Sequence, residues 1–274
     1  MATPIGNLAD LSLRAIHVLA RADVVACEDT RVGGALLRHL GLDKTLLAVH
    51  HHNEREGAQR VLARLACGEC VAFISDAGTP AVSDPGAALV AAAVTAGYRV
   101  VPIPGASAAL AALSVAGDVG ATSFTFIGFL PSKGQERADA VARVAQATQT
   151  QILFEAPHRI ADLLDTLALC AATRWLTLAR ELTKQFETIV SMSASKAPAW
   201  LAEQAQRSRG EFVVVLHACK PVPESGMLSE AAQRTLQVLL AELPLKQAVA
   251  LAATLTGAPR NLLYQSALDM RRNE

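Results

Sequence analysis

The sequence has no excess of charge of either sign and no long apolar run. Lys plus Arg and Asp plus Glu each total 25 among 274 residues, so the formal net charge is zero. A protein that held nucleic acid by bulk electrostatics alone would be basic, so any RNA contact must use a local patch. The longest apolar stretch, near Ala87–Ala96, is alanine-rich and too short to span a bilayer.

Other absences narrow the protein class. No basic segment followed by an apolar one opens the chain, so we expect a cytoplasmic protein and no membrane partner. The five cysteines are odd in number and scattered, which favours reduced thiols. Cys67 and Cys70 have CxxC spacing, but no second CxxC completes a zinc site, and we predict no metal. Neither GxxxxGK[ST] nor GxGxxG occurs, so the common nucleotide-binding loops are missing.

The first part of the chain alternates short apolar runs with segments of helical spacing. This pattern predicts a mostly parallel, doubly wound α/β sheet. The predicted strands are Val24–Cys27, Thr45–Val49, Val71–Ile74 and Arg99–Ile103.

Beyond residue 118 the pattern changes. Several β-branched runs lie close together, which favours a mixed sheet with antiparallel pairs. A Pro/Gly/Ser-containing linker over 220–226 then precedes three helix-sized segments, which have the length of a helix-turn-helix or of a small helical cap. We predict three domains, at 1–118, 119–220 and 227–274.

Small-residue loops are the most informative feature of the sequence. They span Thr3–Asn7, Ser75–Pro80 and Pro104–Ala108, and the last two each follow an apolar run. The carboxyl ends of parallel strands open the ligand crevice of an α/β sheet, and small residues let a ligand approach the backbone. We expect residues 76–79 to face a ligand, with Asp84 as N-cap and Pro85 as first residue of the next helix.

Charged residues gather at other strand ends. Glu28, Asp29 and Arg31 follow one strand, where the acids either serve a helix N-terminus or meet a substrate. A second polar turn runs from His50 through His51 and His52 to Asn53. Successive histidines point in different directions and rarely share a metal, so we interpret His50 or Asn53 as a substrate contact.

Two further charged segments lie in the second half. Arg180, Glu181, Lys184 and Glu187 form either a solvated hairpin or a cleft that orients an anionic or hydroxyl substrate. Arg159 ends the FEAPHR segment beside a strand end.

Taken in order, these blocks are TPIGNL, EDTR, HHNE, SDAGTP with SDPG, PGASA, GFLP, FEAPHR, ARELTK and RGE. Together they closely resemble the bacterial small-subunit ribosomal RNA cytidine 2′-O-ribose methyltransferases, of the tetrapyrrole methylase-like (class III) superfamily. The resemblance covers essentially the whole chain and extends to the family's C-terminal helical domain.

The resemblance implies two α/β domains with S-adenosylmethionine bound in the cleft between them, in a homodimer. It also implies methyl transfer to a decoding-centre cytidine in the assembled small subunit. The cofactor-side residues it implies are Pro4, Gly6, Asn7, Asp76, Ala77, Gly78, Thr79, Ala106, Ser107 and Ala108.

The acceptor hydroxyl is a weak acid, so a base or a cation should help it lose its proton. Lys184 is a candidate base if its pKa is lowered, or a cation that stabilises the developing alkoxide. Asp29 and Glu28 are the rival bases. The candidate RNA contacts are Arg31, His50, Asn53, Arg159 and Arg180.

Two other functions remain open from the sequence. A methylase of small tetrapyrroles would share the cofactor loops but would not need the C-terminal helical unit. A non-catalytic RNA-binding or ribosome assembly factor on the same fold would bind the cofactor weakly or not at all.

One feature departs from the resembled family, whose members carry an apolar strand just before the loop at Thr3. This chain has Met1-Ala2 at that place. We therefore expect its parallel sheet to lack an inner strand, with unpaired ladder groups at roughly 1 kcal/mol or more each.

Overall fold

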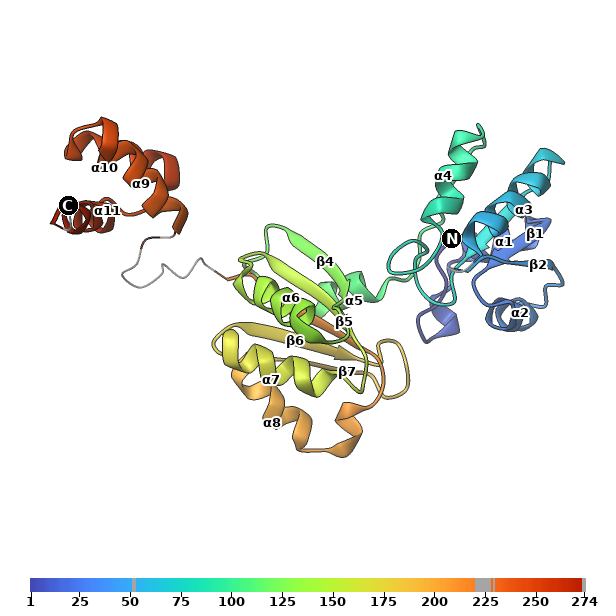
Figure 1. The fold of residues 1–274 in the computed structure, drawn as a ribbon. Coiled ribbons are helices and arrows are strands. Elements are labelled where there is room, and N and C mark those ends of the chain that lie inside the picture. Colours follow the sequence, from blue (N-terminus) through green and yellow to red (C-terminus); the bar gives the residue numbers. More distant parts are fainter. Residues whose placement is uncertain (51–52, 220–227, 229, 273–274) are drawn as a thin grey trace. The chain divides into compact units, whose positions relative to one another are not determined.

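The computed structural model describes residues 1–50, 53–219, 228 and 230–272. The chain divides into two compact units, Met1–Cys219 and Lys220–Glu274. The strands of the first unit form two separate sheets (Figure 1). The predicted boundary at residue 118 falls between the last strand of one sheet and the first strand of the other. The predicted linker over 220–226 lies outside the described residues.

The first sheet is parallel and three-stranded, in the order β2-β1-β3. The elements of this part of the chain, in order, are the 3-10 helix η1 (Leu8–Asp10), α1 (Leu13–Arg21), β1 (Val24–Cys27), α2 (Thr30–His39), β2 (Thr45–Ala48), α3 (Glu54–Ala66), β3 (Val71–Ile74) and α4 (Ala87–Thr95). In β1, Val25 and Cys27 pack with α1 and α2, whereas Ala26 packs with α3 and α4. Helices therefore cover both faces, and the predicted doubly wound arrangement is confirmed.

The prediction of a strand at Arg99–Ile103 is wrong, because no ladder among the described residues includes this segment. The Ala2 amide donates to the Ile103 carbonyl at 3.2 Å, and the Met1 amino group donates to the Phe73 carbonyl at 2.9 Å. A strand needs a run of paired residues, and these isolated bonds do not supply one. The apolar character of Arg99–Ile103 therefore does not suffice to predict a strand.

The second sheet has five strands in the order β4-β5-β8-β6-β7. Strands β4 and β5 are parallel, and the other neighbours are antiparallel, as predicted for a mixed sheet. The elements of this part are α5 (Ala108–Ala116), β4 (Phe124–Phe129), α6 (Gly134–Gln146), β5 (Thr150–Glu155), α7 (Ile160–Cys170), β6 (Trp175–Arg180), β7 (Thr188–Ser193), η2 (Ala194–Lys196), α8 (Ala197–Ala202), η3 (Ala205–Ser208) and β8 (Phe212–Leu216).

Both faces of this sheet are buried along its central strands, β5, β8 and β6. Leu153 and Val214 pack with α6 and α7 on one face, while Ile152 and Val215 pack with α5 on the other. Because successive residues of a strand point to opposite faces, such strands are apolar at nearly every position. The five residues of β8 are all buried.

In its described residues the second unit contains three helices, as predicted: α9 (Glu230–Glu242), α10 (Leu245–Thr256) and α11 (Arg260–Arg272). Leu236, Val249 and Leu263 bring one side chain from each helix into a shared core. Gly257 caps the C-terminal end of α10 with φ 70°, a left-handed conformation that glycine adopts at little cost. No helix of the described part of the chain is long and apolar enough to cross a membrane.

The packing of α7 predicts a contrast between two of its leucines. Leu163 is fully buried, whereas Leu169 is 88% exposed. Leu163→Ala should lower the free energy of unfolding by about 2–5 kcal/mol, because it leaves a cavity in the core of the second sheet. Leu169→Ala should change it by no more than about 0.5 kcal/mol. Urea denaturation followed by circular dichroism measures both, and equal losses would contradict the packing described.

Candidate active site

The predicted ligand loops meet in the first unit. Thr3 and Gly78 exchange backbone hydrogen bonds of 2.9 and 3.1 Å as an isolated antiparallel bridge. The Thr79 hydroxyl donates to the Ala106 carbonyl at 3.0 Å, and the Thr3 hydroxyl donates to the Ser75 carbonyl at 3.1 Å. The three loops, distant in sequence, therefore form one hydrogen-bonded surface.

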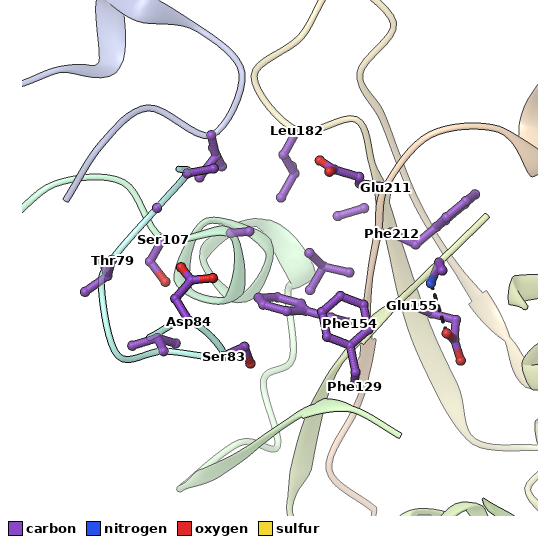
Figure 2. Close-up of a pocket in the computed structure, with 18 of the residues that line it drawn as sticks. Thr79, Ser83, Asp84, Ser107, Phe129, Phe154, Glu155, Leu182, Glu211 and Phe212 are labelled. Carbon is purple, nitrogen blue, oxygen red and sulfur yellow. Dashed lines mark hydrogen bonds between the residues drawn. The ribbon is translucent and has the colours of Figure 1, made fainter. Parts of the chain in front are cut away.

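A cavity of about 370 Å³ opens beside this surface (Figure 2). Five predicted cofactor-side residues line it, namely Ala77, Gly78, Thr79, Ser107 and Ala108. The second sheet supplies much of its apolar wall, and Figure 2 shows Phe129 and Phe154 across from the loop that carries Thr79 and Asp84. These two rings meet edge to face, with their centroids 5.6 Å apart. The volume lies in the range of small-molecule sites, which run to about 300–1,000 Å³.

The other predicted cofactor-side residues lie elsewhere. Pro4 and Asp76 line a separate cavity of about 230 Å³ beside α2. The Asn7 side chain accepts a hydrogen bond from the Ala9 amide as the N-cap of η1. Ala106 contributes its backbone carbonyl to the bond with Thr79, and a side chain on Gly6 would collide with Lys184.

The loop after Thr79 also forms part of the cavity wall. Val82, Ser83 and Asp84 line the cavity, while Ala81 and Ser83 have φ values of 64° and 63°. Non-glycine residues rarely adopt this left-handed conformation, which is concentrated at functional sites. Asp84 is not the N-cap of α4, as the sequence predicted, because that position belongs to Gly86. Asp84 instead faces the cavity.

Lys184 lies between two carboxylates. Its Nζ donates at 2.9 Å to Glu181 Oε1 and at 2.9 Å to Glu211 Oε2. Glu181 also accepts from the Glu211 amide at 2.9 Å, which joins the two segments ARELTK and RGE. Gly210 permits this contact, because a Cβ there would lie 2.5 Å from Glu181 Cγ.

The environment of Lys184 decides its protonation. Burial alone would lower the pKa of the ammonium, but the hydrogen bonds to Glu211 and Glu181 outweigh it and hold the pKa above its ordinary value of 10.5. Lys184 is therefore a cation at neutral pH. This geometry favours the electrostatic alternative over a lysine base.

The EDTR turn begins α2. Asp29 is the N-cap and accepts from the Arg31 amide at 2.8 Å, while its two oxygens accept from Arg31 Nε at 3.0 Å each. The hydrogen bonds from the Arg31 guanidinium hold the pKa of Asp29 at about 2, and its carboxylate is a weak base at neutral pH. The Asp29 amide donates to Asp76 Oδ1 at 3.0 Å, which ties this turn to a ligand loop. Glu28 is half-buried beside it.

Two arginines predicted as RNA contacts are engaged within the fold. Arg159 donates to the Leu130 and Pro131 carbonyls at 2.7 and 2.8 Å and forms an ion pair with the buried Glu155 at 3.1 Å. Arg180 is buried and donates to the Arg209 and Phe186 carbonyls. Arg31, in contrast, has a side chain that is 89% exposed.

The polar turn after β2 is closed by Asn53. Its side-chain oxygen accepts from the His50 amide at 2.8 Å, and its NH₂ donates to the Ala48 carbonyl at 3.2 Å. These bonds tie Asn53 to His50 and to the end of β2, a role that the sequence pattern did not indicate. His51 and His52 lie outside the described residues.

Sequence reasoning missed several cavity residues. Phe129, Phe154, Leu182 and Glu211 line the cavity, and each lies inside one of the blocks GFLP, FEAPHR, ARELTK and RGE, although none was assigned a role there. All five cysteines are free thiols, and the described residues contain no cluster of three or more His, Cys, Asp or Glu with metal-binding geometry.

Two family models match nearly the whole chain. The model for tetrapyrrole (corrin/porphyrin) methylases matches residues 2–198, and the RsmI C-terminal HTH domain matches residues 226–271. The curated protein Ribosomal RNA small subunit methyltransferase I of Escherichia coli O157:H7 is 45% identical over 98% of this chain and 93% of its own length. Its namesake from Pseudomonas aeruginosa is 47% identical over 98% of this chain and 95% of its own length.

The chain belongs to this methyltransferase family.

Solved structures of the family's fold agree with this assignment. Cobalt precorrin-4 methyltransferase CbiF has a TM-score of 0.58 at 17% identity, covering 78% of this chain and 92% of its own. A uroporphyrin-III C-methyltransferase from Thermus thermophilus, complexed with S-adenosyl homocysteine, has a TM-score of 0.53 at 18% identity, covering 78% and 94%. At these identities the likeness establishes the shared fold.

The Asp29–Arg31 pair predicts an unusually acidic carboxyl in this methyltransferase. In an NMR titration the Asp29 carboxyl should titrate near pH 2, against 3.8 for an ordinary aspartate. Because its pKa is depressed in the folded chain, the stabilisation from the pair is complete above about pH 3.8 and is lost as the pH falls through about 2. Arg31→Ala should return the pKa of Asp29 towards 3.8. A wild-type titration near pH 4 would contradict the geometry.

Proposed function

We propose that this chain transfers the methyl group of S-adenosylmethionine to the ribose 2′-hydroxyl of a cytidine in the decoding centre of small-subunit ribosomal RNA. The observation that carries the proposal is the 370 Å³ cavity walled by the predicted cofactor loops. Its support is that the relatives named for small-subunit rRNA methylation align with nearly the full length of the chain. The match to their C-terminal domain extends this support.

The cavity residues fit the proposed cofactor. S-adenosylmethionine combines polar groups with a flat adenine ring. The cavity offers backbone at Gly78, hydroxyls at Thr79 and Ser107, and aromatic faces at Phe129 and Phe154. Gly78 has φ 77°, a conformation that favours glycine and leaves the backbone accessible. When bound, the cofactor supplies both the methyl group and its own leaving group.

The chain's own residues must align the acceptor oxygen, exclude water and stabilise negative charge. We assign the last task to Lys184, whose ammonium is fixed by Glu181 and Glu211 close to the cavity that Glu211 itself lines. The low pKa of Asp29 argues against that carboxylate as the base, and we propose Glu28 in its place.

The exposure of each side chain decides which residues we propose as substrate contacts. We propose Arg31 as the phosphate contact, because its guanidinium is exposed beside the site while also paired with Asp29. His50 and Asn53 would present the neighbouring turn to RNA, with Arg159 and Arg180 acting by supporting the cavity wall. We further propose a cytoplasmic homodimer whose substrate is the small ribosomal subunit, divided into the domains 1–118, 119–220 and 227–274.

The alternative functions differ in what they require. The fold is shared with proteins whose names describe corrin and porphyrin methylation, so a tetrapyrrole acceptor is a second candidate. The match of residues 226–271 to an HTH domain favours RNA. A non-catalytic assembly factor is the third candidate, and it would show no methyl transfer.

Incubation with unmethylated small subunits and labelled S-adenosylmethionine tests the proposal. We expect label on the 2′-oxygen of one cytidine, found by nuclease mapping. Lys184→Ala should lower kcat by about 10²-fold or more, because a charge-stabilising group is lost. Cofactor affinity, measured by calorimetry, should persist.

Lys196→Ala is the matched control, since this exposed lysine lines neither cavity. Equal turnover in both variants would remove Lys184 from the chemistry. Absence of label on RNA, with label on a porphyrin instead, would favour the tetrapyrrole alternative.

A further inference from the structure

A carboxylate from one helix caps the start of another. Glu54 is the first residue of α3, and its Oε1 accepts hydrogen bonds from the backbone amides of Gly86 at 2.9 Å and Ala88 at 3.2 Å. These amides lie at the N-terminus of α4, where backbone N–H groups have no partner inside the helix and the dipole favours negative charge. Glu54 therefore serves as an N-cap supplied from outside α4.

Helix α4 cannot supply this cap itself. Its N-cap residue is Gly86, with φ 129°, and a Cβ at this position would collide with the ring of Phe73. A capping serine, threonine or aspartate is excluded there by both the backbone conformation and the close approach. The side chain that satisfies these amides must come from elsewhere in the fold, and Glu54 provides it.

The backbone that Glu54 caps directly follows the loop that forms part of the cavity wall. Ser83 and Asp84 line the 370 Å³ cavity immediately before Gly86, and Figure 2 shows both on the same loop as Thr79. The loop holds Ala81 and Ser83 in left-handed conformations, with φ 64° and 63°. Such conformations persist only when surrounding contacts enforce them. Glu54 supplies one of these contacts at the loop's exit.

On its N-terminal side in the sequence, Glu54 follows the polar segment after β2. It directly follows Asn53, whose side chain bonds to the His50 amide and the Ala48 carbonyl. Because Asn53 is the N-cap of α3, a displacement of Asn53 would also displace the start of α3 and the Glu54 carboxylate that holds the cavity loop. His50 is thus connected to the cavity loop through Asn53 and Glu54.

We propose that Glu54 is a positioning residue that fixes the cofactor-facing loop 79–86 and couples it to His50 and Asn53. The proposal rests on the proposed function, in which the cavity holds S-adenosylmethionine and the turn faces RNA. Glu54 contacts neither directly. It acts through the amides of Gly86 and Ala88.

Calorimetry with S-adenosylhomocysteine tests this role. We expect Glu54→Ala to raise Kd by about fivefold, the equivalent of losing one helix cap. Glu54→Gln keeps an oxygen that can accept the same hydrogen bonds, so its Kd should lie much closer to wild type. Glu56→Ala, on the same helix turn with a 73% exposed side chain, is the matched control and should leave Kd unchanged.

Hydrogen exchange supplies a readout that needs no ligand. The amides of Gly86 and Ala88 should exchange at least about fivefold faster in Glu54→Ala than in Glu56→Ala, because they lose their acceptor. A purely structural role would lower Tm in Glu54→Ala while leaving Kd, measured well below Tm, at the wild-type value. That result would overturn the proposal.

The outcomes separate the two proposals. If wild type binds S-adenosylhomocysteine and Glu54→Ala binds it equally well, the positioning role fails and the proposed function stands. If wild type does not bind S-adenosylhomocysteine, the proposed function fails, and the positioning role fails too because it rests on that function. Slow exchange at Gly86 and Ala88 in Glu54→Ala would also overturn the role, whatever the ligand result.

Discussion

The site depends on a small piece of backbone pairing. Thr3 and Gly78 exchange two hydrogen bonds across 75 residues of chain, and the Thr79 hydroxyl extends the connection to Ala106. Loops that close on a ligand lose conformational entropy, and pairing them in advance removes part of that loss from the binding step. Because Gly78 also lines the cavity, the residue that joins two of the loops is itself part of the cavity wall.

A second constraint is the close approach of side chains to the backbone of glycines, where a Cβ would not fit. Gly6 leaves room for Lys184, Gly210 leaves room for Glu181, and Gly86 leaves room for Phe73. In each case the neighbouring side chain belongs to another segment, so these glycines set the distances between segments. The charged group that results at Lys184 has an elevated pKa because both carboxylates are held within hydrogen-bonding distance.

Much of the fold was predictable because local patterns matched the final packing. The four buried residues of β1 and the apolar run of β8 read directly as strands. Of the three ligand loops only Ser75–Pro80 follows a strand, β3, so the polarity of parallel strands accounts for that loop alone. Hydrogen bonds from Gly78 and Thr79 bring the other two loops to it. Arg99–Ile103 failed as a strand because pairing depends on a neighbour that local sequence does not reveal. The Glu54 cap was also invisible, since its partners lie more than 30 residues away.

The site residues divide in the same way. Sequence reasoning identified Arg159 and Arg180 as charged and near strand ends, but charge alone does not distinguish a side chain that meets RNA from one that meets backbone carbonyls. The structure gives both arginines carbonyl partners. Glu155, which pairs with Arg159 and Arg137, is fully buried and needs both cations to offset its desolvation.

The strand order of the second sheet has a consequence for synthesis. Strand β8 comes last among the described strands but lies between β5 and β6 and forms hydrogen bonds with both. While the chain emerges from the ribosome, β5 and β6 have no shared partner until residue 216 is available. The first sheet is complete at Ile74. At that stage of synthesis the first sheet is complete, whereas β5 and β6 still expose unpaired backbone edges. Such edges can pair with other chains and aggregate unless a chaperone covers them.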